Sequence, residues 1–236
     1  MSSLAKIYQD GTYATKNSAF GDDNAAAKIS WALKACKEFK LGHQTIAEVG
    51  CGGGAILLGV AEALKPESAV GFEPMAEAFE VAEKRTTPTV SFKNETVSHS
   101  SNDFFDLVIC FDVFEHIEDY FTFLRNLRML GKNFLFHIPL DMNAQMVARG
   151  TPIQMVREEV GHIHYFSKDS AIAALKECGF SVRGHFYTCG ADGAYSGRLF
   201  RMMKYPRKIA FALAPDLAVR VLGGYSLMVW ASQEPV

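Results

Sequence analysis

The chain has 236 residues, with 24 Lys and Arg against 26 Asp and Glu, and 49% of its residues are hydrophobic. This composition supports a sizeable core and excludes a wholly disordered chain. The near-neutral charge disfavours nucleic acid as a partner. No apolar stretch reaches the roughly 18–20 residues of a membrane span. The N-terminus has no apolar signal core.

The chain begins with an arm, residues 1–22, that is rich in turns and aromatic side chains. We expect this arm either to fold over a ligand as a lid or to cover the edge of a sheet. Asp22 or Asp23 is a suitable cap for a helix that runs to about Lys40, with Gly42 as its stop.

A short apolar strand, residues 45–49, follows this helix and leads into Gly50, Gly52 and Gly54. The next residues, 55–64, predict another helix. A strand, a glycine turn and a helix in this order bring the backbone close to a nucleotide-like ligand. Glycine at these positions permits positive φ and leaves no side chain to block the ligand.

The segments that follow alternate between strand and helix in the same way. We predict strands at 68–72, 89–92, 106–111 and 133–138, and helices at 75–85 and 117–130. The strand at 106–111 is a continuous apolar run, which is typical of a strand buried on both faces. The alternation predicts an α/β fold with a doubly wound, mostly parallel sheet.

The later part of the chain has a different pattern. We expect an irregular or helical stretch at 141–166, a helix at 169–178, a strand at 180–187, helices over 195–221 with breaks at Pro206 and Pro215, and a last strand at 222–231. The whole chain, 1–236, is predicted to be a single domain. It comprises an N-terminal arm and helix (1–42), a cofactor-binding half (43–140) and a substrate-side half (141–236).

The glycine turn alone fits two ligand classes. Gly50-x-Gly52-x-x-Ala55 satisfies the loose dinucleotide pattern, which leaves a NAD(P)-dependent oxidoreductase as an alternative. Glu48, just before the first glycine, would repel a pyrophosphate but suits a ligand with an ammonium group. Glu73 ends the next strand at the spacing expected for a carboxylate that accepts both ribose hydroxyls. A purely structural turn without a ligand is the remaining alternative.

Four segments occur in order at plausible spacing: EVGCGGG, GFEP, FDLVICFDVFEHIED and HIHYFSKDSAIAALKECGFSV. Over residues 8–190 the chain resembles class I S-adenosylmethionine-dependent methyltransferases, and the small-molecule enzymes among them in particular. The resemblance implies a Rossmann-like, seven-stranded sheet of order 3-2-1-4-5-7-6 with strand seven antiparallel. It also implies methyl transfer from S-adenosylmethionine to an oxygen, nitrogen or carbon of a small molecule. A non-catalytic cofactor-binding module is the alternative outside enzymes.

The resemblance also implies roles for individual residues. Glu48 would lie near the methionine ammonium, Glu73 on the ribose, Pro74 or Met75 beside the adenine, and Glu95 on the adenine amine. The predicted cofactor-binding set is Tyr13, Glu48, Gly50, Cys51, Gly52, Gly54, Glu73, Pro74, Glu95, Thr96, Phe111 and Asp112.

Four histidines, His116, His137, His162 and His164, could act as a general base, because imidazole suits proton removal near neutral pH. The first three are the predicted catalytic set. Asp112, Glu115 and His116 resemble a run that holds a divalent metal in some quinone O-methyltransferases. On a helix these three positions would share a face. Metal-free relatives carry similar residues, so no metal is predicted, and Glu115 and His116 are expected to shape the pocket mouth.

The five cysteines form no CxxC pair, which favours reduced thiols and a cytoplasmic protein. The basic and apolar run 198–208 is either a solvated helix face or a contact for an anionic substrate, a phospholipid surface or RNA. A homodimer remains one option. No motif identifies the methyl acceptor or its reacting atom.

Overall fold

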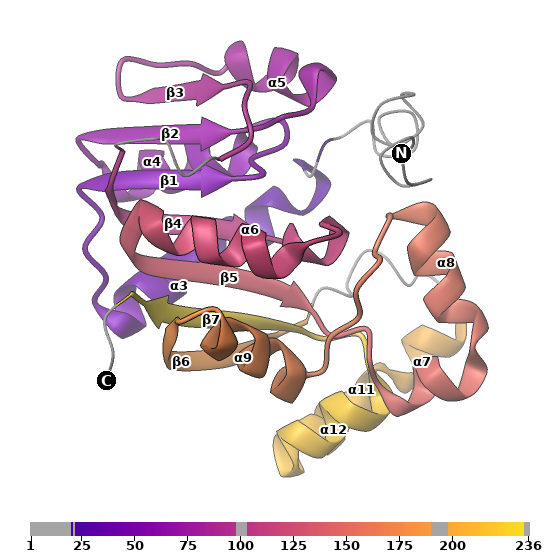
Figure 1. Cartoon of the computed structure of the whole chain (residues 1–236). Coiled ribbons are helices and arrows are strands. Elements are labelled where there is room, and N and C mark those ends of the chain that lie inside the picture. The colour runs from indigo at the N-terminus through magenta and orange to yellow at the C-terminus, as the bar shows by residue number, and fades with distance from the viewer. Residues whose placement is uncertain (1–19, 21, 98–102, 190–197, 234–236) are drawn as a thin grey trace.

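The computed structural model describes residues 20, 22–97, 103–189 and 198–233 (Figure 1). The predicted arm, with Tyr13, therefore lies outside the described residues. So do the side chains of 198–204, which carry much of the predicted basic run.

Seven strands form one sheet of order β3-β2-β1-β4-β5-β7-β6. The first five strands are parallel, and β7 runs antiparallel to both β5 and β6. This topology confirms the predicted doubly wound α/β fold. The strands are β1 Thr45–Val49, β2 Ser68–Phe72, β3 Val90–Lys93, β4 Phe105–Phe111, β5 Gly131–Pro139, β6 Ser181–Thr188 and β7 Ser226–Ser232.

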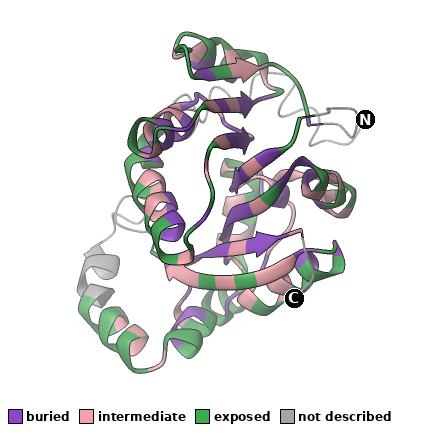
Figure 2. Cartoon of the chain, turned by 90° about the vertical axis from the view of Figure 1, so that its left-hand side faces the viewer, coloured by how far each residue is buried: buried purple, intermediate pink, exposed green. Residues whose placement is uncertain are grey.

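Helices cover both faces of the sheet (Figure 1). On one face, α3 (Ala25–Phe39) and α4 (Ala55–Leu64) share a buried apolar cluster with the strands. On the other face, α6 (Tyr120–Leu127) and α9 (Lys168–Glu177) do the same. Buried positions gather on the central strands and on the inward sides of the helices (Figure 2). β4 is buried along almost its whole length, as its continuous apolar sequence predicts.

Four further helices lie together beyond the sheet: α7 Ala144–Arg149, α8 Thr151–Glu159, α11 Arg198–Leu213 and α12 Pro215–Leu222 (Figure 1). The remaining helical elements are η1 Asp22–Asn24, α5 Ala76–Glu83, η2 Phe114–His116 and η3 Arg128–Leu130.

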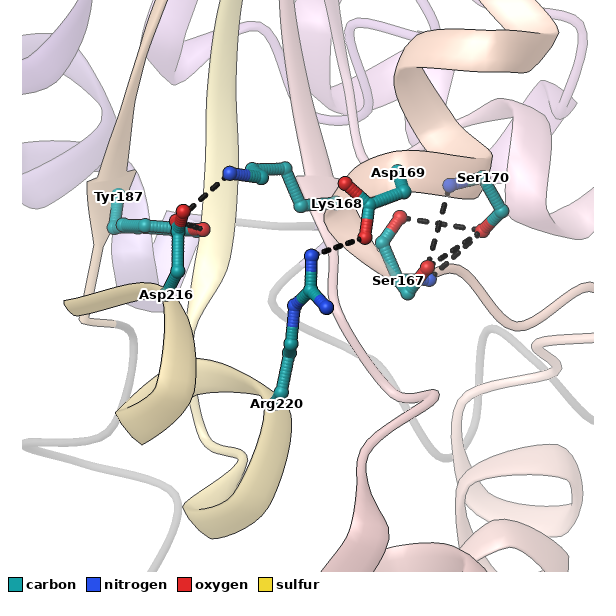
Figure 3. A network of polar contacts seen from close by, with 7 residues as sticks. All are labelled: Ser167, Lys168, Asp169, Ser170, Tyr187, Asp216 and Arg220. Carbon is teal, nitrogen blue, oxygen red and sulfur yellow. Dashed lines mark hydrogen bonds and ion pairs between the residues drawn. The ribbon is translucent and has the colours of Figure 1, made fainter. Parts of the chain in front are cut away.

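Polar contacts fasten α12 to the sheet side of this group (Figure 3). Asp216 pairs with Lys168 of α9 at 2.8 Å and accepts a hydrogen bond from the Tyr187 hydroxyl of β6. Arg220 pairs with Asp169 at 2.7 Å. The carboxylates of these pairs are exposed, so each contact contributes little stability by itself. Together they fix where α12 lies against α9 and β6.

The helix predicted over 117–130 starts later in the structure, at Tyr120, and its last residues form η3. The chain forms the short η2, leaves helical geometry, and starts α6 only at Tyr120. The side chain of Asp119 caps α6 by accepting from the N–H of Thr122 at 3.1 Å. An aspartate that satisfies this free N–H ends the preceding turn and begins a new helix.

Two boundaries in the last part of the chain also differ from the prediction. Pro206 lies inside α11 and does not break it, whereas Pro215 does mark a boundary, at the start of α12. The first turn tolerates proline because its missing N–H would have no partner there. Gly223 ends α12 with φ of +59°, so the last strand starts at Ser226 and not at 222.

Candidate functional site

A cavity of about 690 Å³ opens at the carboxyl ends of the parallel strands. Its wall includes the last residues of β1, β2, β4 and β5 and the loops that follow them. Ligands bind at this edge of open α/β sheets, because connections to opposite faces diverge there and leave a crevice. Residues from η1, α3 and the loop after α8 close the cavity from the other sides.

The glycine turn forms the floor of this cavity. Gly50 and Gly52 have φ of +72° and +52°, which L side chains rarely adopt. A Cβ on Gly52 would lie 2.3 Å from the carbonyl oxygen of Phe20, and one on Gly50 would lie 2.6 Å from Val113. The N–H groups of Gly50 and Cys51 donate to the Phe72 carbonyl at 2.9 and 3.2 Å. The turn is thus held against the end of β2, where only glycine fits.

Glu73 lies directly beside the turn and is held in place by two N–H groups. Oε2 accepts from Gly52 and Oε1 from Met75, both at 2.9 Å. Burial raises the pKa of Glu73, and these two hydrogen bonds oppose the rise. Each carboxylate oxygen has a further lone pair, so the group can still accept two hydroxyls from a ligand. This is the arrangement that recognition of a ribose diol requires.

Asp112, at the end of β4, lies within a buried charge network. It has φ of +55°, a conformation that costs a non-glycine residue energy and is often found at functional sites. Its carboxylate contacts Lys28 Nζ at 2.7 Å and His137 Nδ1 at 2.6 Å. Burial opposes the charged form, but His137 and Lys28 hold the pKa of Asp112 below its ordinary value.

His137 supports Asp112 from behind. Its Nε2 is hydrogen-bonded to the Thr188 hydroxyl at 2.8 Å, and its ring stacks on Trp31 with centroids 5.2 Å apart. Both ring nitrogens are engaged, and the side chain is buried away from the cavity wall. The predicted role of His137 as a base is therefore wrong in its geometry. The residue orients Asp112 instead.

Glu48 also lies behind the cavity wall, although it was expected beside the methionine ammonium. Only 2% of Glu48 is exposed, and its Oε2 has no hydrogen-bond partner among the described residues. Burial raises its pKa to about 8, against the attraction of Lys28. β1 directs this side chain toward α3 and α4. A contact between Glu48 and the methionine ammonium, directly or through water, stays a prediction.

His116 and His162 lie on the opposite wall of the cavity, close to the buried carboxylate of Glu115. His116 and His162 both line the cavity, with ring centroids 4.8 Å apart. Burial lowers the pKa of His116 to about 4, so its ring is neutral. Glu115 is 1% exposed and does not line the cavity, contrary to its expected place at the mouth. Glu115, His116 and His162 offer ligand atoms within 4.8 Å of one another, whereas Asp112 is turned toward Lys28.

Most of the predicted site residues meet in this one cavity. Those that line it are Gly50, Cys51, Gly52, Glu73, Pro74, Glu95, Thr96, Phe111, Asp112, His116 and His162. Gly54 shapes the turn without lining the cavity, since it caps α4 with φ of +83°. Cys51 is a buried thiol whose pKa burial raises, so it acts as a small wall residue. Sequence reasoning missed the contributions of Phe20, Asn24, Lys28, Val113, Ile117 and Phe123.

A profile described as a methyltransferase domain matches residues 22–185, more than half of the chain. The chain belongs to this methyltransferase family. It is an S-adenosylmethionine-dependent enzyme, as the motifs predicted, and this assignment overturns the oxidoreductase alternative. No curated protein matches the sequence closely enough to count as a relative.

Several solved structures share the methyltransferase fold at low sequence identity. Magnesium protoporphyrin IX methyltransferase from Synechocystis PCC 6803, with bound S-adenosylhomocysteine, is 15% identical, with a TM-score of 0.56 over 99% of this chain and 89% of its own. The plantazolicin methyltransferase BpumL is 14% identical, with a TM-score of 0.63 over 98% and 95%. Mitomycin 7-O-methyltransferase MmcR is 14% identical, with a TM-score of 0.65 over 98% and 61%. These likenesses confirm the fold.

The methyltransferase cavity fits its cofactor. Gly50 and Gly52 leave the floor bare, Glu73 offers acceptors for a ribose, and Lys28 with Asp112 presents a cation beside an anion. None of the helices in the described part of the chain is long and apolar enough to span a membrane.

Proposed function

We propose that this methyltransferase binds S-adenosylmethionine across the glycine turn and methylates a small molecule held against the His116 and His162 wall. The observation that carries the proposal is Glu73. Its carboxylate is fixed by two N–H groups at 2.9 Å and still has an open lone pair on each oxygen. The neighbouring loop residues Glu95 and Thr96 line the same end of the cavity, which suits the adenine.

The charge network at Asp112 suits the amino-acid end of the cofactor. A free amino acid carries an ammonium and a carboxylate on one carbon, and Asp112 and Lys28 offer the opposite charges at 2.7 Å separation. Asp112 would hold the ammonium and Lys28 the carboxylate. His137 keeps Asp112 in this orientation, so the binding groups are arranged before the ligand arrives.

The bound cofactor supplies a methyl group on a positively charged sulfur, which is already activated for displacement. The chain then needs to place the acceptor in line with that methyl and to exclude water. Ile117, Phe123, Pro139 and Val160 supply apolar surface on the acceptor side. His116 and His162 are the polar groups there and remain the candidates for handling the acceptor proton.

The acceptor class is supported by two features. The cavity wall as a whole is more apolar than polar, which suits a small organic molecule. In addition, the fold neighbours named above act, by their descriptions, on a porphyrin, on mitomycin and on plantazolicin. A cytoplasmic location is supported by the five free cysteines. Division of the chain into cofactor and substrate halves remains a prediction.

The proposal is tested with labelled S-adenosylmethionine and a library of small hydroxyl, amine and carbon acids. We expect transfer of label to at least one compound, and loss of that transfer in Lys28→Met. The non-catalytic alternative predicts cofactor binding with no turnover on any compound. Failure to bind the cofactor would contradict both.

A further inference from the structure

The helices α11 and α12, which lie beyond the sheet (Figure 1), expose a row of large apolar side chains. Tyr205, Ile209 and Leu213 recur every four residues along α11, and Leu217 and Val221 continue this spacing on α12. Each of the five is between 42% and 81% exposed. Residues four apart share one face of a helix, so each helix presents an apolar stripe to solvent. We call these five residues the exposed stripe.

The opposite faces of the two helices hold them to the rest of the protein. In α11, the ring of Phe211 stacks on Tyr225 with centroids 5.1 Å apart, and Arg207 Nη1 donates to the last carbonyl of α12 at 2.9 Å. In α12, Ala218 and Val219 are buried, and ion pairs join this helix to α9 (Figure 3). Because these inward faces already make the packing contacts, the exposed stripe is not needed to hold the helices in place. Apolar surface left over in this way marks an interaction site.

The same segment of the chain is strongly basic. The 16 residues of α11 include five Lys or Arg and no acid, although the whole chain has a net charge of −2. Lys208, beside Ile209 of the exposed stripe, is itself exposed. The single acid of residues 198–222 is Asp216, whose charge is compensated by Lys168 at 2.8 Å. Positive charge therefore accompanies the exposed stripe and acts over the roughly 8–10 Å that physiological salt leaves unscreened.

We propose that the face formed by α11 and α12 binds the surface of a bilayer that contains anionic phospholipids. A helix with an apolar face and Lys or Arg beside it lies in the interface of such a bilayer. Its apolar side chains enter the acyl boundary, and its cations stay near the headgroups. Tyr205 suits the headgroup level, where tyrosine is enriched. The helices would lie on the bilayer, since none in the described part of the chain is long and apolar enough to cross it.

The combination of charge and apolar surface favours a bilayer over two other partners. In a twofold-symmetric dimer the same surface lies on both copies, so two basic helices without acids would face each other and repel. Nucleic acid would satisfy the charges. It is bound largely through its phosphates, however, which leaves aliphatic side chains such as Ile209, Leu213 and Leu217 without partners. An anionic bilayer satisfies both the cations and the apolar side chains.

The test is co-sedimentation of the full chain with two kinds of vesicle, one of phosphatidylcholine alone and one with an equal amount of phosphatidylglycerol. We expect binding to the mixed vesicles that weakens in high salt, and roughly tenfold or weaker binding to phosphatidylcholine alone. Leu213→Ser should weaken binding to the mixed vesicles roughly tenfold or more, because it removes an apolar side chain from the contact. Lys208→Glu should weaken it roughly 5- to 30-fold, because it replaces an attracted charge by a repelled one.

The matched controls are Phe104→Ser and Lys37→Glu, which make similar changes at exposed residues outside α11 and α12. Both control proteins should bind the mixed vesicles as the parent does. Thermal unfolding checks that every variant is folded. Because Leu213 and Lys208 are exposed, we expect their variants to keep the melting temperature of the parent.

Equal binding to the two kinds of vesicle, or equal binding by the parent and Leu213→Ser, would overturn the proposal. A parent dimer that Leu213→Ser dissociates in light scattering would also overturn it and assign the face to a second copy. Binding of polyuridylate that Lys208→Glu weakens and Leu213→Ser does not would overturn it in favour of RNA. The vesicles are tested without cofactor, so failure here leaves the proposed function to its own test with S-adenosylmethionine.

Discussion

Replacement of Glu73 by Gln probes the ribose site with a side chain of the same size. Both carboxylate oxygens already accept N–H groups, from Gly52 and Met75, at 2.9 Å. Glutamine has one oxygen and one NH₂ group, so its NH₂ must face one of these donors and can no longer accept from the ribose. A hydrogen bond to a charged group contributes about 1.5–3 kcal/mol, which corresponds to a roughly 10- to 150-fold loss of affinity.

The assay is calorimetric titration of S-adenosylhomocysteine into the parent and into Glu73→Gln. The matched control is Glu77→Gln, an exposed acid in the first turn of α5 that does not line the cavity. We expect the control to bind as the parent does. Thermal unfolding confirms that both variants are folded. A folded Glu73→Gln protein that binds within twofold of the parent would refute the assignment of Glu73 to the ribose.

Three further predictions follow from the same geometry. Gly52→Ala should destabilise the fold by more than the 1–2 kcal/mol typical of a left-handed alanine, because its Cβ would lie 2.3 Å from a carbonyl oxygen; Gly150→Ala, with φ of +68° and no described atom within 4 Å, isolates the φ cost in chemical denaturation. Lys28→Met should weaken S-adenosylhomocysteine binding in calorimetry by about tenfold or more, because methionine lacks the ammonium group that would pair with the ligand carboxylate. Burial gives Glu48 a pKa of about 8 in the folded state against 4.5 ordinarily, so the stability it contributes below about pH 4.5 is lost as the pH rises through 8. Glu48→Gln should therefore gain a few kcal/mol relative to the parent between about pH 5 and pH 9, measured by urea denaturation at each pH.

The parts of the site that could be predicted from the sequence are local. The glycine turn and Glu73 each follow directly after a strand, and parallel strands bring their carboxyl ends to one edge. Gly50, Gly52 and Glu73 therefore meet wherever the alternation of strands and helices is assigned correctly. The sheet order follows the family resemblance, and the structure confirms it.

Lys28 could not be predicted, because nothing in the sequence distinguishes it from the other lysines of its helix. Its role depends on how α3 packs across the sheet, which brings Nζ to 2.7 Å from Asp112. A charge network between elements distant in sequence has no periodic signature. The burial of Glu48 could not be predicted for a related reason, since the face of β1 to which it belongs is set by the packing of α3 and α4.

The cluster around Glu115 shows a different limit. The prediction treated Asp112, Glu115 and His116 as positions of one helix, which share a face. In the structure Asp112 has a left-handed backbone and η2 begins only at Phe114, so the helical spacing does not apply. The third member of the cluster, His162, comes from the loop after α8. Its place beside Glu115 depends on hydrogen bonds between segments that no local pattern predicts.

The central claim, that this cavity binds S-adenosylmethionine, is tested most directly by calorimetry with two competing ligands. We expect S-adenosylhomocysteine to bind the full chain at one site, and NADH to show no binding under the same conditions. Tight binding of NADH with no heat from S-adenosylhomocysteine would contradict the account.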